Sequence, residues 1–387
     1  MDLGEGVAVS AGGVPPDVEL AAELVSVTFK SPVTVSRARA RITGPHWERG
    51  REAEIEDDWS GTARKMRLPP EPYSTRAAVY LVSGAGDAHE VEVKVRITKN
   101  QNVSGQAVLV GALSGLTIEG SCPSAAGEHT VAARIANAPE TARAFRGRIG
   151  WALASDGAGV TLGLGTTLAE IYFILGQPRP PFARHGVWVE ALRFVCGRIG
   201  AIDSSDGQTV AGRIAHYCHS QHSLRYETDR GASRYGVRSH GGSFELTRYM
   251  RREADDCNCY DQAAAIQTFS AALGIPVGWR YLSPFGYIKT THLVGVGWCN
   301  NPFFGSDVSQ KVVAVDSPER SAFGNHAFIA DAAELTLDGC AGPHVGEETA
   351  FQYLSASIDD TPALYRGRFR PGRVHDIVPT AGVRRVS

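Results

Sequence analysis

Two cysteines stand one residue apart in the stretch DDCNCYDQAAAIQTFSAALGIP, which runs from Asp255 to Pro276. The residues behind them have the spacing of a short helix, with small and apolar side chains on one face. Asn258 can cap the first turn, and Gly274 predicts where the helix ends. Cys259 would then lie where unpaired backbone N–H groups and the helix dipole favour an anion such as a thiolate.

A thiolate enzyme also needs a histidine that exchanges protons and a third group that fixes the tautomer of the imidazole. The stretch FGNHAFIADAAELTLDGCAGP offers both, as His326 and Asp338. HAFIA and ELTLDG have the pattern of two short strands joined by a tight turn. Neighbouring antiparallel strands lie about 4.8 Å apart, so a carboxylate on one can reach a ring nitrogen on the other. The sequence therefore predicts a triad of Cys259, His326 and Asp338.

Other residues compete for these roles, and each has a plainer interpretation. Cys257 could be a resolving thiol or half of a metal site, but Cys-x-Cys has no matching pair elsewhere in the chain. Asp331 is the rival carboxylate, although its odd separation from His326 turns it to the opposite face of the strand. Three further candidates are ordinary surface or hydrogen-bonded groups, namely His292, His344 and Asp316, the last in a predicted strand that runs into a turn.

The segment NCYDQAAAIQTFSAALGIPVGWRY resembles the nucleophile helix of the transglutaminase-like superfamily. In that family a Cys followed by an aromatic residue starts a helix that ends in Leu-Gly-Ile-Pro, with fifteen residues from Cys to Gly. The same spacing separates Cys259 from Gly274. HAF is similar to the family's His-Ala-aromatic strand, LTLDG to its following Asp strand, and AHYCHSQHSLRYE to the segment before the nucleophile helix.

The resemblance implies an α+β, papain-like fold, with a helix packed on an antiparallel sheet and a catalytic triad of Cys259, His326 and Asp338. It covers about residues 187–346, which is under half of the chain. Phe328 stands where the family usually has Trp, and the chain lacks the paired Cys-x-x-Cys zinc motif of the glycopeptide-amidase branch. The substrate class therefore does not follow from the resemblance, and no metal or other cofactor is implied.

The rest of the chain has the period-two pattern of half-buried strands, and we expect two β-sandwich-like domains ahead of the catalytic one. The proline-rich GQPRPPF marks the boundary at which the period changes from two to helical. We interpret the arginine-rich end of the chain as a solvated tail rather than a nucleic-acid arm. The predicted division is a disordered tail at 1–16, β domains at 17–102 and 103–182, a transglutaminase-like domain at 183–365 and a basic tail at 366–387.

The composition of the chain bears on its partners and on its cellular compartment. The chain holds 39 Lys and Arg against 41 Asp and Glu, so no overall field favours nucleic acid or an anionic membrane. Seven cysteines without framework spacing indicate free thiols in a reducing compartment. We expect no signal peptide at the start, and no apolar run is long enough to span a bilayer, which favours a cytoplasmic protein. A protein delivered by a dedicated secretion machine would also lack a signal peptide. GLGTTLAE lacks the third glycine of a dinucleotide site.

Two functions remain open from the sequence. The first is a cysteine-dependent enzyme that cleaves or exchanges an amide bond of a protein or peptide through an acyl-thioester on Cys259. It could be a protease, an amidase or deamidase, or a transamidase, and we favour hydrolysis because transamidation needs a site that excludes water. The alternative is a non-catalytic interaction protein whose β domains bind a partner. The sequence does not predict the oligomeric state.

Overall fold

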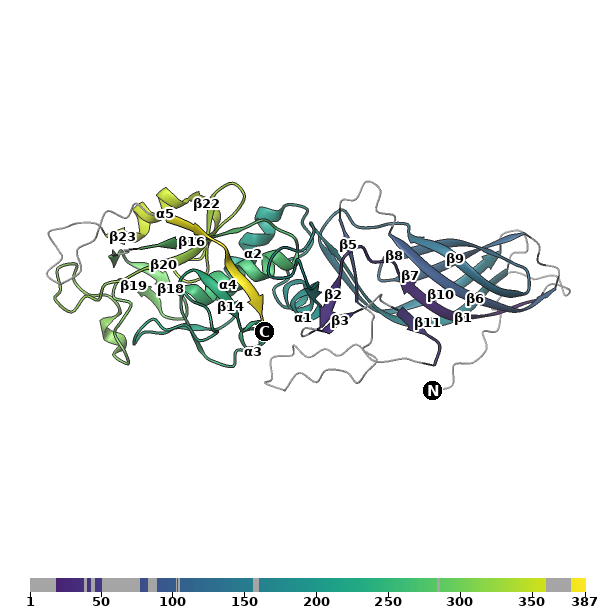
Figure 1. Cartoon of the computed structure of the whole chain (residues 1–387), viewed down its shortest axis with the longest axis horizontal. Coiled ribbons are helices and arrows are strands. Elements are labelled where there is room, and N and C mark those ends of the chain that lie inside the picture. Colours follow the sequence, from purple (N-terminus) through teal and green to yellow (C-terminus); the bar gives the residue numbers. More distant parts are fainter. Residues whose placement is uncertain are drawn as a thin grey trace. The chain divides into compact units, whose positions relative to one another are not determined.

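A computed structural model describes residues 19–37, 40–42, 46–50, 77–82, 89–101, 103, 105–155, 160–283, 286–359 and 377–387. The chain forms two compact units (Figure 1), one of Met1–Ser60 and Arg64–Gly176 and the other chiefly of Gln177–Ser387. The division falls at the start of the proline-rich segment GQPRPPF. Among the described residues, no helix has both the length and the apolar composition needed to cross a membrane.

The first unit is one curled sheet of nine described strands, in the order β4-β1-β6-β9-β8-β7-β10-β11-β5 (Figure 1). Its strands are β1 Glu19–Phe29, β4 His46–Glu48, β5 Ala77–Leu81, β6 Glu90–Gln101, β7 Gln106–Leu113, β8 Leu116–Pro123, β9 Gly127–Ile135, β10 Arg143–Ser155 and β11 Val160–Ile174. Two short strands, β2 Val35–Arg37 and β3 Ala40–Ile42, pair with each other.

This sheet differs from the two separate β domains predicted at 17–102 and 103–182. β6, from the first predicted domain, pairs antiparallel with β9 from the second, in the register Glu90↔Arg134 to Ile97↔Gly127. β5 likewise pairs with β11, in parallel. The buried side chains of these strands form one hydrophobic core. The alternating pattern predicts which face of each strand is buried, but the same pattern fits one large sheet as well as two small ones.

The second unit contains helices and an antiparallel sheet of five described strands in the order β22-β21-β20-β16-β24. The helices are α1 Val189–Arg193, which continues as a π-helix over Phe194–Arg198, α2 Gly207–Ser220, α3 Leu246–Arg251, α4 Cys259–Ala272 and α5 Ala350–Ser357, and a 3₁₀ turn spans Val308–Lys311. The strands of the sheet are β16 Gly278–Leu282, β20 His326–Ala330, β21 Leu335–Asp338, β22 His344–Thr349 and β24 Ile377–Thr380. The remaining short strands are β12 Val187–Trp188, β13 Arg225–Tyr226, β14 Gly241–Phe244, β15 Asp256–Cys257, β17 Tyr287–Ile288, β18 Thr291–Leu293, β19 Gly297–Cys299, β23 Ile358–Asp359 and β25 Gly382–Val386.

α4 is the central helix of this unit and is buried on nearly every face, as its run of alanines, Ile266 and Phe269 predicts. One side packs on β20, and the Phe269 ring stacks on Phe194 with a centroid separation of 5.0 Å. The helix begins at Cys259 after the cap residue Asn258, as the sequence predicts. Gly274 follows the last turn with a φ of 79°, in the left-handed region that favours glycine.

Part of the basic tail predicted at 366–387 forms strands, although most of its described residues remain exposed or half-buried. Ile377–Thr380 forms β24, which pairs with β16, and Gly382–Val386 forms β25, which pairs in parallel with β14. Gln267 of α4 holds this segment, because its Oε1 accepts from the Val383 N–H at 2.8 Å. The predicted disordered tail at 1–16 and residues 366–376 lie outside the described residues.

Candidate active site

The first turn of α4 is fixed by a reciprocal cap. Asn258 Oδ1 accepts from the Asp261 N–H, and Asp261 Oδ2 accepts from the Asn258 N–H, each at 3.1 Å. The buried Asp261 carboxylate also accepts from Ser233 Oγ at 2.6 Å and from the Arg234 N–H at 2.9 Å. Burial raises the pKa of Asp261 to about 6, although these hydrogen bonds oppose the shift. The cap therefore sets the position of Cys259 and attaches a neighbouring loop to the same turn.

His326 and Asp338 meet because their strands are neighbours. β20 and β21 pair antiparallel, with Ile329 opposite Leu337, as HAFIA and ELTLDG predict. His326 Nε2 donates a hydrogen bond to Asp338 Oδ2 at 2.8 Å. The nearby side chain of Cys259 adds to the effect of Asp338 in raising the pKa of the His326 ring. Since Nε2 is bonded to Asp338, Nδ1 is the ring nitrogen left to exchange a proton with a thiol.

The charges of this cluster are set by burial and by the partners. His326 is 2 % exposed, and burial alone would lower its pKa. The charge of Asp338, with the hydrogen bond to Asp338 and a contribution from Cys259, outweighs burial and raises the His326 pKa from its ordinary 6.5 to about 10. Burial would raise the pKa of Asp338, but the charge of His326 lowers it. At neutral pH the cluster therefore holds a charged imidazolium beside an ionised carboxylate.

Tyr353 is a member of this cluster that the sequence did not point to. It lies on α5, is fully buried, and donates its hydroxyl proton to Asp338 Oδ2 at 2.8 Å. Its oxygen also lies 2.9 Å from His326 Nε2. Asp338 Oδ1 accepts from the Cys340 N–H at 2.7 Å, so both carboxylate oxygens have donors.

Aromatic rings surround the histidine on another side. The Phe323 ring lies edge-on to His326, with 6.1 Å between centroids, and stacks on Phe303 at 5.6 Å. Tyr226 packs against Phe323 at 5.8 Å, and burial, with a smaller contribution from the nearby Cys259, raises the pKa of the Tyr226 phenol well above its usual value. Cys259 itself is only 4 % exposed. A substrate would therefore reach the sulfur through an aromatic, water-poor environment.

The competing residues have other partners. Cys257 is fully buried beside Gln262, whose Nε2 donates to its sulfur at 3.3 Å, and burial raises the Cys257 pKa well above its usual value. Asp331 accepts with Oδ1 from the N–H groups of Ala333 at 2.9 Å and Leu335 at 2.8 Å, so it belongs to the turn between β20 and β21. In the part of the chain that the structure describes, no three His, Cys, Asp or Glu side chains are grouped to hold a metal ion.

His292, His344 and Asp316 also have surroundings of their own. His344 Nδ1 bonds the carboxylate of Glu348, and the ring packs edge-on against Tyr353. His292 is exposed and packs edge-on against Trp298, with 5.6 Å between the ring centroids. Asp316 lies in an exposed turn, where a strand end was predicted.

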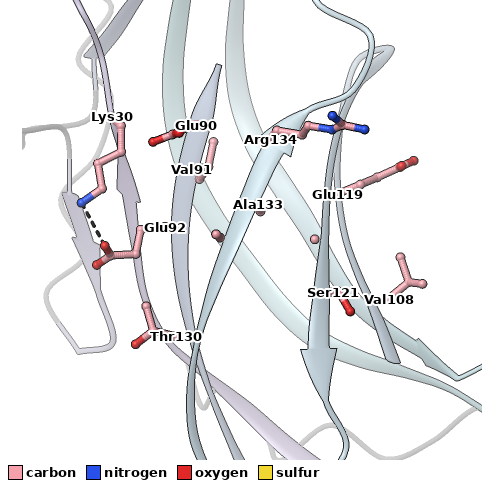
Figure 2. Close-up of a pocket in the computed structure, with 12 residues that line it drawn as sticks. Lys30, Glu90, Val91, Glu92, Val108, Glu119, Ser121, Thr130, Ala133 and Arg134 are labelled. Carbon is pink, nitrogen blue, oxygen red and sulfur yellow. Dashed lines mark ion pairs between the residues drawn. The ribbon is translucent and has the colours of Figure 1, made fainter. Parts of the chain in front are cut away.

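Neither of two surface hollows has Cys259, His326 or Asp338 in its lining. One, of about 640 Å³, lies on the sheet of the first unit and is lined by two basic and three acidic side chains among small residues (Figure 2). Lys30 and Glu92 form an ion pair of 2.9 Å there. The other, of about 580 Å³, lies between α2 and β22 and is lined by Asp206, Arg213, His216 and Glu347 among others. Their mixed charges indicate no single class of ligand.

Comparison with known proteins found that no protein-family model and no curated protein matches the chain.

Proposed function

We propose that the second unit is a cysteine-dependent, transglutaminase-like amide-bond enzyme in which Cys259 attacks a carbonyl of a protein or peptide. One observation carries this proposal: the imidazole of His326 is hydrogen-bonded to Asp338, and Cys259 is near enough to the ring to help raise its pKa. The thiol stands at the first residue of a helix, where an anion is favoured. A buried His-Asp pair that faces a thiol at a helix start has the elements of nucleophilic catalysis.

The first half of the reaction forms a thioester. Because His326 is charged at neutral pH, the reaction begins with the proton already on His326 Nδ1 and with Cys259 as a thiolate beside the imidazolium. The sulfur attacks the carbonyl carbon, and the π-electron pair moves to oxygen, where backbone N–H groups at the start of α4 can stabilise the oxyanion. When the oxyanion collapses, the C–N bond breaks and the leaving nitrogen takes the proton from His326.

The second half releases the acyl group. Water attacks the thioester carbon and gives a proton to His326 Nδ1, and collapse then expels the Cys259 thiolate and yields a carboxylic acid. An amine in place of water would give transamidation. We favour hydrolysis, because transamidation requires an amine to enter while water is kept out.

Asp338 would act by orientation and charge. Its hydrogen bond fixes Nε2 as the protonated nitrogen, so that Nδ1 can exchange protons with the sulfur. Because its own pKa is lowered, Asp338 remains a carboxylate throughout and does not take the imidazolium proton.

A substrate screen tests the proposal. Wild type, Cys259→Ala and Cys257→Ala would each be incubated with peptides, with glutamine-containing peptides, and with both plus a primary amine. The readouts are new amino termini, released ammonia and incorporated amine. We expect turnover in wild type and Cys257→Ala, and none in Cys259→Ala. Equal turnover in Cys259→Ala would contradict the proposal, and a folded wild type inert on every class would favour a binding function.

A further inference from the structure

We propose that Tyr353 is a positioning residue that sets the direction and strength of the Asp338–His326 interaction, a role that rests on the proposed function. Three atoms form a closed triangle: His326 Nε2 to Asp338 Oδ2 at 2.8 Å, Tyr353 Oη to Oδ2 at 2.8 Å, and Oη to Nε2 at 2.9 Å. The phenol therefore contacts both members of the pair.

The fold holds the phenol in this place. α5 starts with a reciprocal cap, in which Gln352 Oε1 accepts from the Thr349 N–H at 2.9 Å. The Tyr353 ring then packs between Phe328, at 5.2 Å between centroids, and His344, at 4.6 Å. A fully buried hydroxyl has few alternative partners, and leaving it without one would be costly. Its contact with the Asp338 carboxylate is thus a fixed feature of the packing.

Several charged or titratable groups face Asp338. Among the side chains that donate a hydrogen bond to its carboxylate, Tyr353 is the neutral one. Cys340, just after β21, donates its N–H to Oδ1, and His326 on β20 donates to Oδ2. His344 on β22, itself bonded to Glu348, lowers the Asp338 pKa by its charge, and Asp338 in turn acts on His219 of α2. Burial raises the pKa of Tyr353 well above its usual value, so the phenol keeps its proton.

A hydroxyl that donates to Oδ2 draws negative charge away from the oxygen that faces the imidazolium. The carboxylate then stabilises the imidazolium less strongly, and the ring can release its proton to the leaving nitrogen more readily. The same hydrogen bond prevents the carboxylate from rotating away from Nε2. Removing the hydroxyl should therefore make His326 a weaker acid and leave the His-Asp pair less well aligned.

The test compares Tyr353→Phe with Tyr249→Phe. Tyr249 is also fully buried, but its hydroxyl donates to Gln262 Oε1 at 2.8 Å rather than to the triad. The protonation of His326 would be followed by NMR of ¹⁵N-histidine-labelled protein, with the signal assigned in His326→Asn. In Tyr353→Phe we expect His326 to lose its proton about one pH unit higher than in wild type, the worth of one charge-assisted hydrogen bond. Tyr249→Phe should titrate like wild type.

A titration of Tyr353→Phe that superimposes on wild type would overturn the proposal. If that variant fails to fold, 3-fluorotyrosine at position 353 keeps the ring and gives a more acidic donor, so His326 should then lose its proton at a lower pH. An unchanged titration in the fluorinated protein would equally overturn the proposal. The titration needs no substrate, so the two proposals fail separately. A wild-type protein without turnover would refute the proposed function. A wild-type protein with turnover, in which changes at position 353 leave the His326 titration unaltered, would refute the role of Tyr353.

Discussion

Replacing Asp338 by asparagine changes the acceptors of the cluster without changing its shape. The carboxylate accepts three hydrogen bonds, from His326 Nε2 at 2.8 Å, from the Tyr353 hydroxyl at 2.8 Å and from the Cys340 N–H at 2.7 Å. An asparagine has one accepting oxygen, so its NH₂ group must face a donor on one side or the other. A buried donor left unsatisfied costs about 1–3 kcal/mol of stability.

The larger effect falls on the protonation of His326. Burial lowers the pKa of this ring, and the charge of Asp338 is the largest effect that raises it. Without that charge the pKa should fall below its ordinary value, and the ring should be neutral at pH 7. An unassisted thiol is ionised to only about 3 % at pH 7, so alkylation of Cys259 should slow by up to about 30-fold. Turnover should fall by about 10⁴-fold, as in other triads in which an amide permits the wrong tautomer.

The assay is the rate of iodoacetamide alkylation of Cys259 at pH 7, with urea unfolding to report stability. Asp331→Asn is the matched control, because Asp331 Oδ1 bonds two N–H groups of its own turn and Oδ2 has no hydrogen-bond partner in the structure. An asparagine can keep both of those bonds, so this variant should alkylate and unfold like wild type. An Asp338→Asn protein that is alkylated at the wild-type rate, or an Asp331→Asn protein that is slowed equally, would refute the roles assigned to the two carboxylates.

Three further outcomes are expected. Cys259→Ala should remove all turnover, while its free energy of unfolding should stay within about 1–2 kcal/mol of wild type. Cys257→Ala should lose a similar packing contribution but keep its activity. Equal loss of activity in both variants would mean that the wrong sulfur was chosen. A fragment of residues 177–387 should fold alone with a cooperative thermal transition, and an insoluble fragment beside a stable full chain would contradict this. The native state retains the His326 proton up to about pH 10, while the unfolded state loses it near pH 6.5. Protonated His326 therefore contributes fully to the unfolding free energy below pH 6.5, and this contribution is lost as the pH rises to 10. Urea unfolding at a series of pH values measures it, and wild type that shows no such loss relative to His326→Asn would contradict the prediction.

The helix and the strand pair at the site were predictable because each is a local pattern. The run of small residues, the cap residue and the terminal glycine of α4 all lie within one short segment, and each agrees with the others. The turn between β20 and β21 is equally local, so the register that brings His326 toward Asp338 could be expected from the sequence.

Longer-range features of the site were not predictable. Tyr353 lies fifteen residues after Asp338, and its contact depends on how α5 packs after β22 rather than on any motif. Asp261 carries a weak signal, since Asn258 and Asp261 have the spacing of a capping box, but its bonds to residues 233–235 do not follow from that spacing.

The sheets show the same limit. In β6 the residues Val91, Val93, Val95 and Ile97 are all buried, as the alternating pattern predicts. That pattern does not specify which strand lies beside it, so one sheet was expected to be two. β24 was missed for a different reason: it pairs with β16 yet has no buried residue, and a strand without a buried face has no alternating pattern.

Mapping the first alkylated cysteine shows whether His326 activates Cys259 among the seven thiols. Burial raises the pKa of the other six thiols, namely Cys122, Cys196, Cys218, Cys257, Cys299 and Cys340. Wild type and His326→Asn would be treated with limiting iodoacetamide at pH 6, and the modified peptides identified by mass spectrometry. The account predicts that Cys259 is labelled first in wild type and that this preference disappears in His326→Asn. First labelling at another cysteine, or equal labelling of Cys259 in both proteins, would contradict it.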